Sequence, residues 1–230
     1  MDADLIGFYD ILKKGNIMSL LNKTPLKDQV YTIIKDRIMS QQYQLGERIN
    51  INALAQELGI SNTPIRDALA LLEKENLITV TPHAGPQVVR LNSTVFHETF
   101  DAVLVLLLGG YEFCIYHNRI PILASLMSES IDAQKAIANT GNNRAFAEAT
   151  IAVDTAIVTA CNNPHLTSIF SGTFSLQTLL LIHDYQTSEY DRWGNIREHE
   201  MILGNITVGR YEEARRLLQQ HYVRSILFSY

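Results

Sequence analysis

The spacing of apolar and polar positions predicts three helices near the start of the chain. Thr24 is placed to cap the first, which carries apolar residues at helical spacing and is expected to end near Tyr43. Asn50 precedes the second, "INALAQEL", and Gly59 follows it. Ser61 then precedes a third helix. The second and third helices lie about four residues apart, with a glycine between them, as a helix-turn-helix requires.

Two short strand-like runs, "LITV" and "QVVRL", follow the third helix. They are expected to form a hairpin whose turn contains Pro82, Gly85 and Pro86. Three helices followed by a two-stranded hairpin predict a winged helix-turn-helix.

Beyond Asn92 the strand-like pattern disappears and helical periodicity continues to the end. The predicted fold is therefore mostly α, with the N-terminal winged helix-turn-helix followed by an all-α bundle of six or seven helices. We expect an N-terminal extension at 1–22, a winged helix-turn-helix domain at 23–92 and an all-α domain at 93–230. The helical stretches expected in the bundle are 94–117, 121–139, 144–161, 164–187, 194–207 and 210–228.

The net charge of −5 alone argues against nucleic-acid binding, but the charge is unevenly distributed. Residues 23–92 carry eight Lys and Arg against seven Asp and Glu, and residues 93–230 carry nine against fourteen. Two cysteines are too few for a disulfide framework and fit a reducing compartment. No uninterrupted apolar stretch is long enough to span a bilayer and no signal peptide is visible, so we expect a cytoplasmic protein without a membrane partner.

The third helix opens with polar residues of the kind that read base edges. In a helix-turn-helix, the N-terminal turn of the second helix of the motif enters the major groove. Asn pairs with adenine and Arg with guanine, so Asn62, Thr63 and Arg66 are the candidates for base contacts. An ordinary capped surface helix is the simpler alternative. Candidates for phosphate and minor-groove contacts are Ser61, Lys35, Arg48 and the hairpin tip at His83 and Gly85.

A long segment of this half resembles the DNA-binding domain of GntR-type bacterial transcription regulators. The motifs "GERI", "LGIS", "TPIRDAL", "LE…LI" and "PHAG" occur in the family's order and spacing. The resemblance implies a regulator acting as a homodimer on a palindromic operator. One position departs from the pattern: Asn62 stands where the family usually has Arg, so we expect a different operator sequence while Arg66 is retained.

The C-terminal half resembles the all-α effector domain of the FCD branch of that family. "EHEMILGNITVGRYEEARRLLQQH" matches its last two helices and "CNNPHL" matches the end of an earlier one. The resemblance implies a divalent-metal site in which His199 and His221 keep their places. Thr150 stands where the family has Asp, and Asp154 where it has His. An arginine that often grips a carboxylate effector falls near Leu108, so it is absent here.

The residues themselves place three polar groups in an apolar bundle. Asp154, His199 and His221 share helical faces with aliphatic residues, where an unpaired carboxylate is costly. Two His and one Asp with open positions suit Zn²⁺ or a similar cation, and Thr150 is a weak fourth member. Two alternatives stay open: a metal-free cluster in which these groups satisfy one another, and an organic, apolar ligand alone.

The predicted function is a ligand-responsive, sequence-specific transcription regulator that senses a small metabolite, with a carboxylic acid as the expected class. A repressor is the preferred direction, and an activator is the alternative. A dimer is expected, either through the bundle or through the apolar run "FDAVLVLLLGGYEF". A metal-dependent enzyme is disfavoured because no nucleophile or general base pairs with the histidines. An architectural DNA-binding protein with a vestigial bundle remains the third hypothesis.

Overall fold

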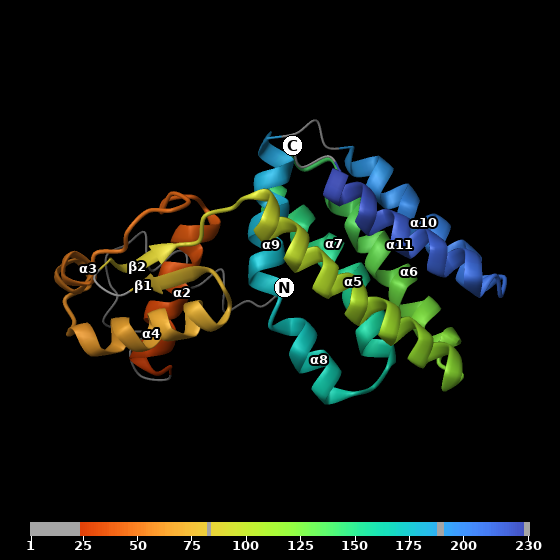
Figure 1. Ribbon diagram of the computed structural model, residues 1–230, viewed down its shortest axis with the longest axis horizontal. Helices are drawn as coiled ribbons and strands as arrows, with labels where there is room; N and C mark the ends of the chain where they lie inside the picture. Colours follow the sequence, from red (N-terminus) through yellow and green to blue (C-terminus); the bar gives the residue numbers. More distant parts are fainter. Residues whose placement is uncertain (1–23, 82–83, 188–190, 228–230) are drawn as a thin grey trace. The chain divides into compact units, whose positions relative to one another are not determined.

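The computed structural model describes residues 24–81, 84–187 and 191–227, and within them it contains ten helices and one two-stranded sheet (Figure 1). The chain divides into two compact units, residues 1–89 and 90–230. The predicted extension at 1–22 lies outside the described residues.

The N-terminal unit is a winged helix-turn-helix, as predicted. Its helices are α2 (Leu26–Met39), α3 (Ile51–Leu58) and α4 (Asn62–Lys74). Strands β1 (Ile78–Thr81) and β2 (Gly85–Val88) pair antiparallel, with Ile78 opposite Val88. The core between the helices is aliphatic, and its fully buried members include Ile34, Ile38, Ile65, Leu72 and Leu77.

Several boundaries in this unit differ from the prediction. Helix α2 begins at Leu26 and ends at Met39, four residues before Tyr43. The helix cannot continue through Gln41, because that residue has a positive φ of 59°. Strand β2 begins at Gly85, so the turn is shorter than expected and Pro86 belongs to the strand.

Residues 46–49 pair with the outer edge of β2. Glu47 O accepts a hydrogen bond from Val88 N at 2.9 Å, and Ile49 N donates to Pro86 O at 2.9 Å. Pro86 has no N–H of its own, but its carbonyl still pairs on this edge. The short "GERI" segment is therefore fixed beside the hairpin.

The C-terminal unit is an all-α bundle of seven helices in the described residues. Asparagine side chains cap α5, α7 and α8 by accepting backbone N–H groups, and Asn163 with Pro164 forms the start predicted for α8. Helix α7 packs against α5, α6, α8 and α9 and lies at the centre of the bundle (Figure 1). The seven are α5 (Ser93–Tyr116), α6 (Ile120–Ile137), α7 (Asn143–Ala160), α8 (Pro164–Ser171), α9 (Phe174–Thr187), α10 (Arg192–Thr207) and α11 (Tyr211–Leu227).

The stretch expected as one helix at 164–187 is two helices, α8 and α9, bent by 42° at their junction. The Thr173 hydroxyl donates to Phe170 O at 2.6 Å, and Thr173 N donates to the same carbonyl at 3.0 Å. A local side-chain bond of this kind competes with the regular helical pattern. The absence of proline at the break explains why periodicity alone predicted a single helix.

Helix α5 is long and apolar, with a mean hydropathy of 1.5 in its most apolar window, a third of which is buried. Length and composition of this kind also occur in core helices of globular domains, and α5 packs against α7, α9 and α11. Gly110 permits the close approach to α7, because a Cβ there would lie 3.3 Å from Ile157 Cγ2. Gly109 has no neighbour within 4 Å of such an atom.

Candidate nucleic-acid interface and effector site

The turn between α3 and α4 has the geometry that sequence reasoning expected. Asn50 Oδ1 caps α3 by accepting from Ala53 N at 3.1 Å, and Gly59 ends that helix in the left-handed conformation with φ of 65°. Ser61 occupies the N-cap position of α4, but its hydroxyl makes no capping hydrogen bond. The first-turn amides of α4 therefore lack a side-chain cap, which leaves them open to an anion.

The three candidate base-reading residues differ in their surroundings. Thr63 and Arg66 are exposed, and neither side chain makes a hydrogen bond or ion pair with the described part of the chain. Asn62 is half-buried, and its Nδ2 donates to Asn52 Oδ1 of α3 at 3.0 Å. Arg66 and Thr63 thus project from the opening turn, whereas Asn62 also braces the two helices.

The residues predicted to contact the DNA backbone and minor groove lie in different surroundings. Arg48 is exposed, bridges to Gln87 of β2, and lies beside the tip, since a Cβ at Gly85 would be 3.9 Å from Arg48 Nη2. Gly85 has φ of 77°, a conformation that glycine adopts easily. Lys35 instead donates to Glu75 Oε2 at 2.9 Å and to Tyr31, so its ammonium is paired within the domain. His83 lies outside the described residues.

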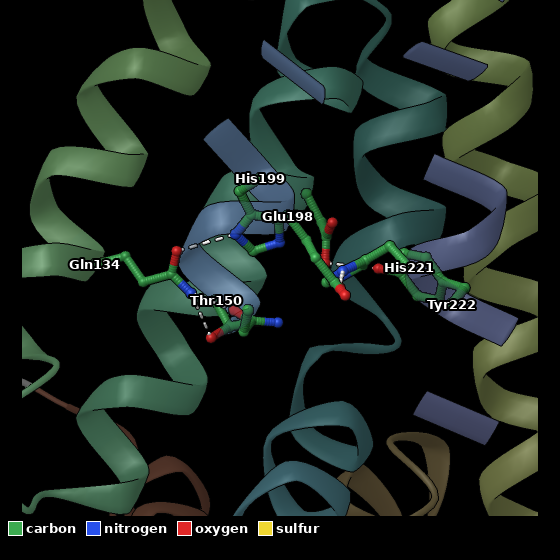
Figure 2. A network of polar contacts seen from close by, with 8 residues as sticks. Gln134, Thr150, Glu198, His199, His221 and Tyr222 are labelled. Carbon is green, nitrogen blue, oxygen red and sulfur yellow. Dashed lines mark hydrogen bonds and ion pairs between the residues drawn. The ribbon is translucent and has the colours of Figure 1, made fainter. Parts of the chain in front are cut away.

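The four candidate effector-site residues are all buried in the helical bundle. Thr150 and Asp154 come from α7, His199 from α10 and His221 from α11. The rings of His199 and His221 lie 4.7 Å apart between centroids. Figure 2 shows His199 between Gln134 on one side and the Glu198–His221 pair on the other.

Asp154 and His221 each have a partner that the sequence did not suggest. Tyr222 Oη donates to Asp154 Oδ2 at 2.6 Å, and His221 Nδ1 donates to Glu198 Oε2 at 2.7 Å. A carboxylate can only accept, so Nδ1 of His221 carries a hydrogen. Asp154 and His221 thus each have a hydrogen-bond partner outside the predicted ligand set.

His199 joins a second network that also contains Thr150. Its Nδ1 lies 2.9 Å from Gln134 Oε1 (Figure 2). Gln134 Nε2 donates to Thr150 Oγ1 at 2.9 Å and to Asn195 Oδ1 at 2.7 Å. His199 Nε2 is buried and has no hydrogen-bond partner.

Burial perturbs the two most enclosed ionisable groups in opposite directions. It raises the pKa of Asp154 to about 6, although His221 and the Tyr222 hydrogen bond favour the ionised form. It holds the pKa of His199 well below its ordinary value, and the neighbouring His221 acts in the same direction. His199 is therefore neutral near pH 7, as a metal-ligating or hydrogen-bonding imidazole must be.

The donor types in this cluster fit a divalent cation. His199 Nε2 is an orphaned buried nitrogen, the Nδ1 atoms of both histidines have acceptors, and the Tyr222 bond uses only Oδ2 of Asp154. As the side chains stand, no three His, Cys, Asp or Glu residues in the described ranges are grouped closely enough to hold a metal. A pocket of about 180 Å³ between α10 and α11 is lined by Glu198 and His221 but not by His199 or Asp154.

Sequence reasoning missed four polar members of the site: Gln134, Asn195, Glu198 and Tyr222. One indication was available, because Gln134 continues the buried spacing of Leu123, Met127 and Ile131 along α6. A glutamine at an apolar helical position needs a buried partner. Glu198 lies between Arg197 and the His199–Glu200 pair in the sequence, and such a run of charged and polar residues is typical of a solvated face.

Both units of the chain match known protein families. Residues 26–88 match "Bacterial regulatory proteins, gntR family", and residues 121–224 match the FCD domain. The two matches together span most of the chain. The chain belongs to the GntR family. This GntR-family protein is a transcription regulator rather than an enzyme, and its C-terminal unit is an FCD effector-binding domain.

Two curated relatives of this GntR-family chain are named as transcription regulators. It is 26% identical over 199 residues to YdhC of Bacillus subtilis (strain 168), an uncharacterised HTH-type transcriptional regulator, covering 86% of this chain and 88% of the relative. It is 25% identical over 204 residues to a probable D-xylose utilization operon transcriptional repressor of Paenarthrobacter nicotinovorans, covering 87% of each.

Two solved structures share the fold of this GntR-family protein. A putative GntR transcriptional regulator from Rhodococcus sp. RHA1 superposes with a TM-score of 0.70 at 16% identity, over 89% of this chain and 98% of the other. McbR/YncC of E. coli gives 0.66 at 19% identity, over 89% and 96%.

Proposed function

We propose that this regulator is a cytoplasmic repressor that binds a palindromic operator as a homodimer and responds to a small metabolite held in its FCD domain. The observation that carries the proposal is the opening turn of α4, where Thr63 and Arg66 are exposed without partners in the described residues. Side chains in this position of a helix-turn-helix reach base edges in the major groove. The probable repressor from P. nicotinovorans supports the direction of regulation.

Around the recognition turn, each candidate has a distinct role. Arg66 reads a guanine and Thr63 an adjacent base. Asn62 pairs with an adenine through its Oδ1 and the Nδ2 hydrogen that Asn52 does not use. Ser61 and the uncapped first-turn amides of α4 bind a phosphate. Arg48 contacts the DNA backbone next to the hairpin tip, because the pairing of residues 46–49 with β2 holds Arg48 beside that tip. Lys35 is the weakest candidate because Glu75 already neutralises it.

The proposed dimer surface is one face of α5. Ala102, Val105, Gly109 and Tyr116 are exposed and recur at helical spacing, with Val105 69% and Tyr116 83% exposed. The charged residue at this spacing, Glu112, is paired with Arg215 of α11. An apolar face of this kind favours burial against a second copy. A two-fold symmetric dimer matches two recognition helices to two half-sites of a palindrome.

The proposed effector site is the buried cluster of α7, α10 and α11. His199, His221 and Asp154 would hold a divalent cation such as Zn²⁺, and Thr150 contributes through Gln134 rather than as a ligand. When bound, the cation supplies open coordination positions for a carboxylate of the effector. A metal-free bundle that senses an apolar ligand is the second candidate, favoured by the hydrogen bonds that already satisfy Asp154 and His221.

Elemental analysis and DNA binding on the same preparations test the proposal. The wild type is expected to carry a divalent metal after supplementation, and the double variant His199→Ala, His221→Ala is expected to lose it. DNA affinity of the double variant stays unchanged while its response to carboxylate metabolites is lost. A metal-free wild type with an apolar molecule in the bundle favours the second candidate. Absence of DNA binding by the wild type contradicts the proposal altogether.

A further inference from the structure

Gln134 is a fully buried glutamine whose side chain connects three helices. It lies on α6, donates to Thr150 of α7 and Asn195 of α10, and contacts His199 of α10. Each polar atom of its amide therefore has a partner. A buried amide with every bond made is held in one orientation, because turning it over would oppose like groups.

The direction of these bonds is set by a backbone carbonyl. Thr150 Oγ1 lies 2.9 Å from Phe146 O. Because a carbonyl can only accept, the threonine hydroxyl donates its single hydrogen to Phe146 O. The oxygen of Thr150 is then an acceptor towards its other neighbours, Gln134 Nε2 at 2.9 Å and the Tyr185 hydroxyl at 3.3 Å. The NH₂ group of Gln134 consequently faces Thr150.

The other end of the amide then fixes the histidine. With its NH₂ group used by Thr150 and Asn195, Gln134 presents Oε1 to His199 Nδ1 at 2.9 Å. That oxygen can only accept, so the ring hydrogen of neutral His199 is on Nδ1. Nε2 carries the lone pair, and it is this atom that is buried without a partner.

We propose that Gln134 is a positioning residue that holds His199 as the Nδ1–H tautomer, so that Nε2 offers its electron pair to a divalent cation. The proposal rests on the effector site described above. It also bears on the ligand chemistry: the Nε2 lone pair repels an ionised carboxylate oxygen, and a cation bound between the two removes that repulsion. Glu198 acts in the same way on Nδ1 of His221.

The tautomer is measured directly by long-range ¹H–¹⁵N correlation of the histidine side chains in the metal-free, full-length protein, with the His199 resonances assigned by His199→Ala. We expect Nδ1 in the protonated, pyrrole-type range and Nε2 in the pyridine-type range. Gln134→Leu removes the acceptor and should give a mixture of tautomers. Thr150→Val, which is nearly isosteric, removes the acceptor that orients the amide and should relax the preference in a milder way.

Gln177→Leu is the matched control, because Gln177 is equally buried but bonds to Thr173 and not to the histidines. Titration with Co²⁺ alone supplies the second readout. Gln134→Leu should weaken Co²⁺ binding by about 10–100-fold, while Gln177→Leu should bind as the wild type does. These affinities separate a positioning role from a merely structural one.

Two results overturn the inference: a wild-type His199 with its hydrogen on Nε2, or a Gln134→Leu protein with unchanged tautomer and unchanged Co²⁺ affinity. If Gln134→Leu does not fold, the wild-type spectrum and Thr150→Val still decide the tautomer. A wild type that shows the Nδ1–H tautomer but binds no Co²⁺ supports the role of Gln134 in setting the tautomer. The same result refutes the cation, and with it the metal-dependent part of the proposed function.

Discussion

Replacing Asp154 by Asn is expected to stabilise the metal-free bundle at neutral pH. Burial raises the pKa of this carboxyl from an ordinary 3.8 to about 6, so the folded state holds the proton more tightly than the unfolded chain does. Keeping Asp154 ionised therefore costs stability above pH 6. Each pKa unit corresponds to about 1.4 kcal/mol, which gives a cost of at most about 3 kcal/mol. Asn removes this cost and keeps an oxygen for the Tyr222 hydroxyl.

The sign of the pH dependence follows from the raised pKa. The advantage of Asp154→Asn should be complete above about pH 6, should shrink as the pH falls from 6 to 3.8, and should vanish below 3.8, where wild-type Asp154 becomes protonated in both states. His199 acts oppositely, because its lowered pKa makes the folded state lose stability as the pH falls below about 6.5. Both proteins carry His199, so its contribution largely cancels in their difference.

Urea unfolding in the presence of EDTA measures this difference. The single tryptophan, Trp193, lies on α10 and reports on the bundle through its fluorescence. Asp101→Asn changes an exposed carboxylate of α5 and serves as the control. In saturating Zn²⁺ the wild type should instead be more stable than Asp154→Asn, because Asp154 then supplies a ligand that stabilises the folded state. An Asp154→Asn protein that is less stable than wild type at neutral pH in EDTA, or a difference independent of pH, refutes the reasoning.

Three further outcomes are expected. Asn62→Arg should move the selected half-site from adenine towards guanine at one position, and an unchanged motif would show that Asn62 serves only to brace α3 through Asn52. Val105→Glu should convert the dimer to monomer in sedimentation at micromolar concentration, whereas a persisting dimer would exclude this face of α5. Gly110→Val should lower the free energy of unfolding by about 1–3 kcal/mol because it overpacks the contact with Ile157, while equal effects of Gly109→Val and Gly110→Val would argue against close packing at Gly110.

Local chemistry explains which parts of the fold sequence reasoning predicted. Asn50 and Gly59 mark helix ends through bonds and backbone angles that depend on a few neighbouring residues, and the structure places both as expected. The break at Thr173 and the pairing of residues 46–49 with β2 depend on a local competition and a long-range contact, which periodicity does not contain.

In the candidate effector site, the burial of the residues could be predicted from the sequence, but their hydrogen-bond partners could not. Burial of Thr150, Asp154, His199 and His221 followed from their positions among aliphatic residues. Their hydrogen-bond partners did not, because Gln134 lies 65 residues from His199 in the chain and meets it only through packing of α6 against α10. Which polar groups satisfy one another in a core is decided by tertiary contacts and not by spacing along one helix.

The most direct test of the DNA-binding claim is selection of genomic fragments by the purified full-length protein, with wild type and Arg66→Ala compared at one fixed salt concentration. The wild type should enrich a shared palindrome whose half-sites lie about one helical turn, or a multiple of it, apart. Arg66→Ala should lose about 1–3 kcal/mol of specific binding and relax the base preference at one position in each half-site. No shared palindrome, or a variant that selects the same motif with the same affinity, would contradict the account.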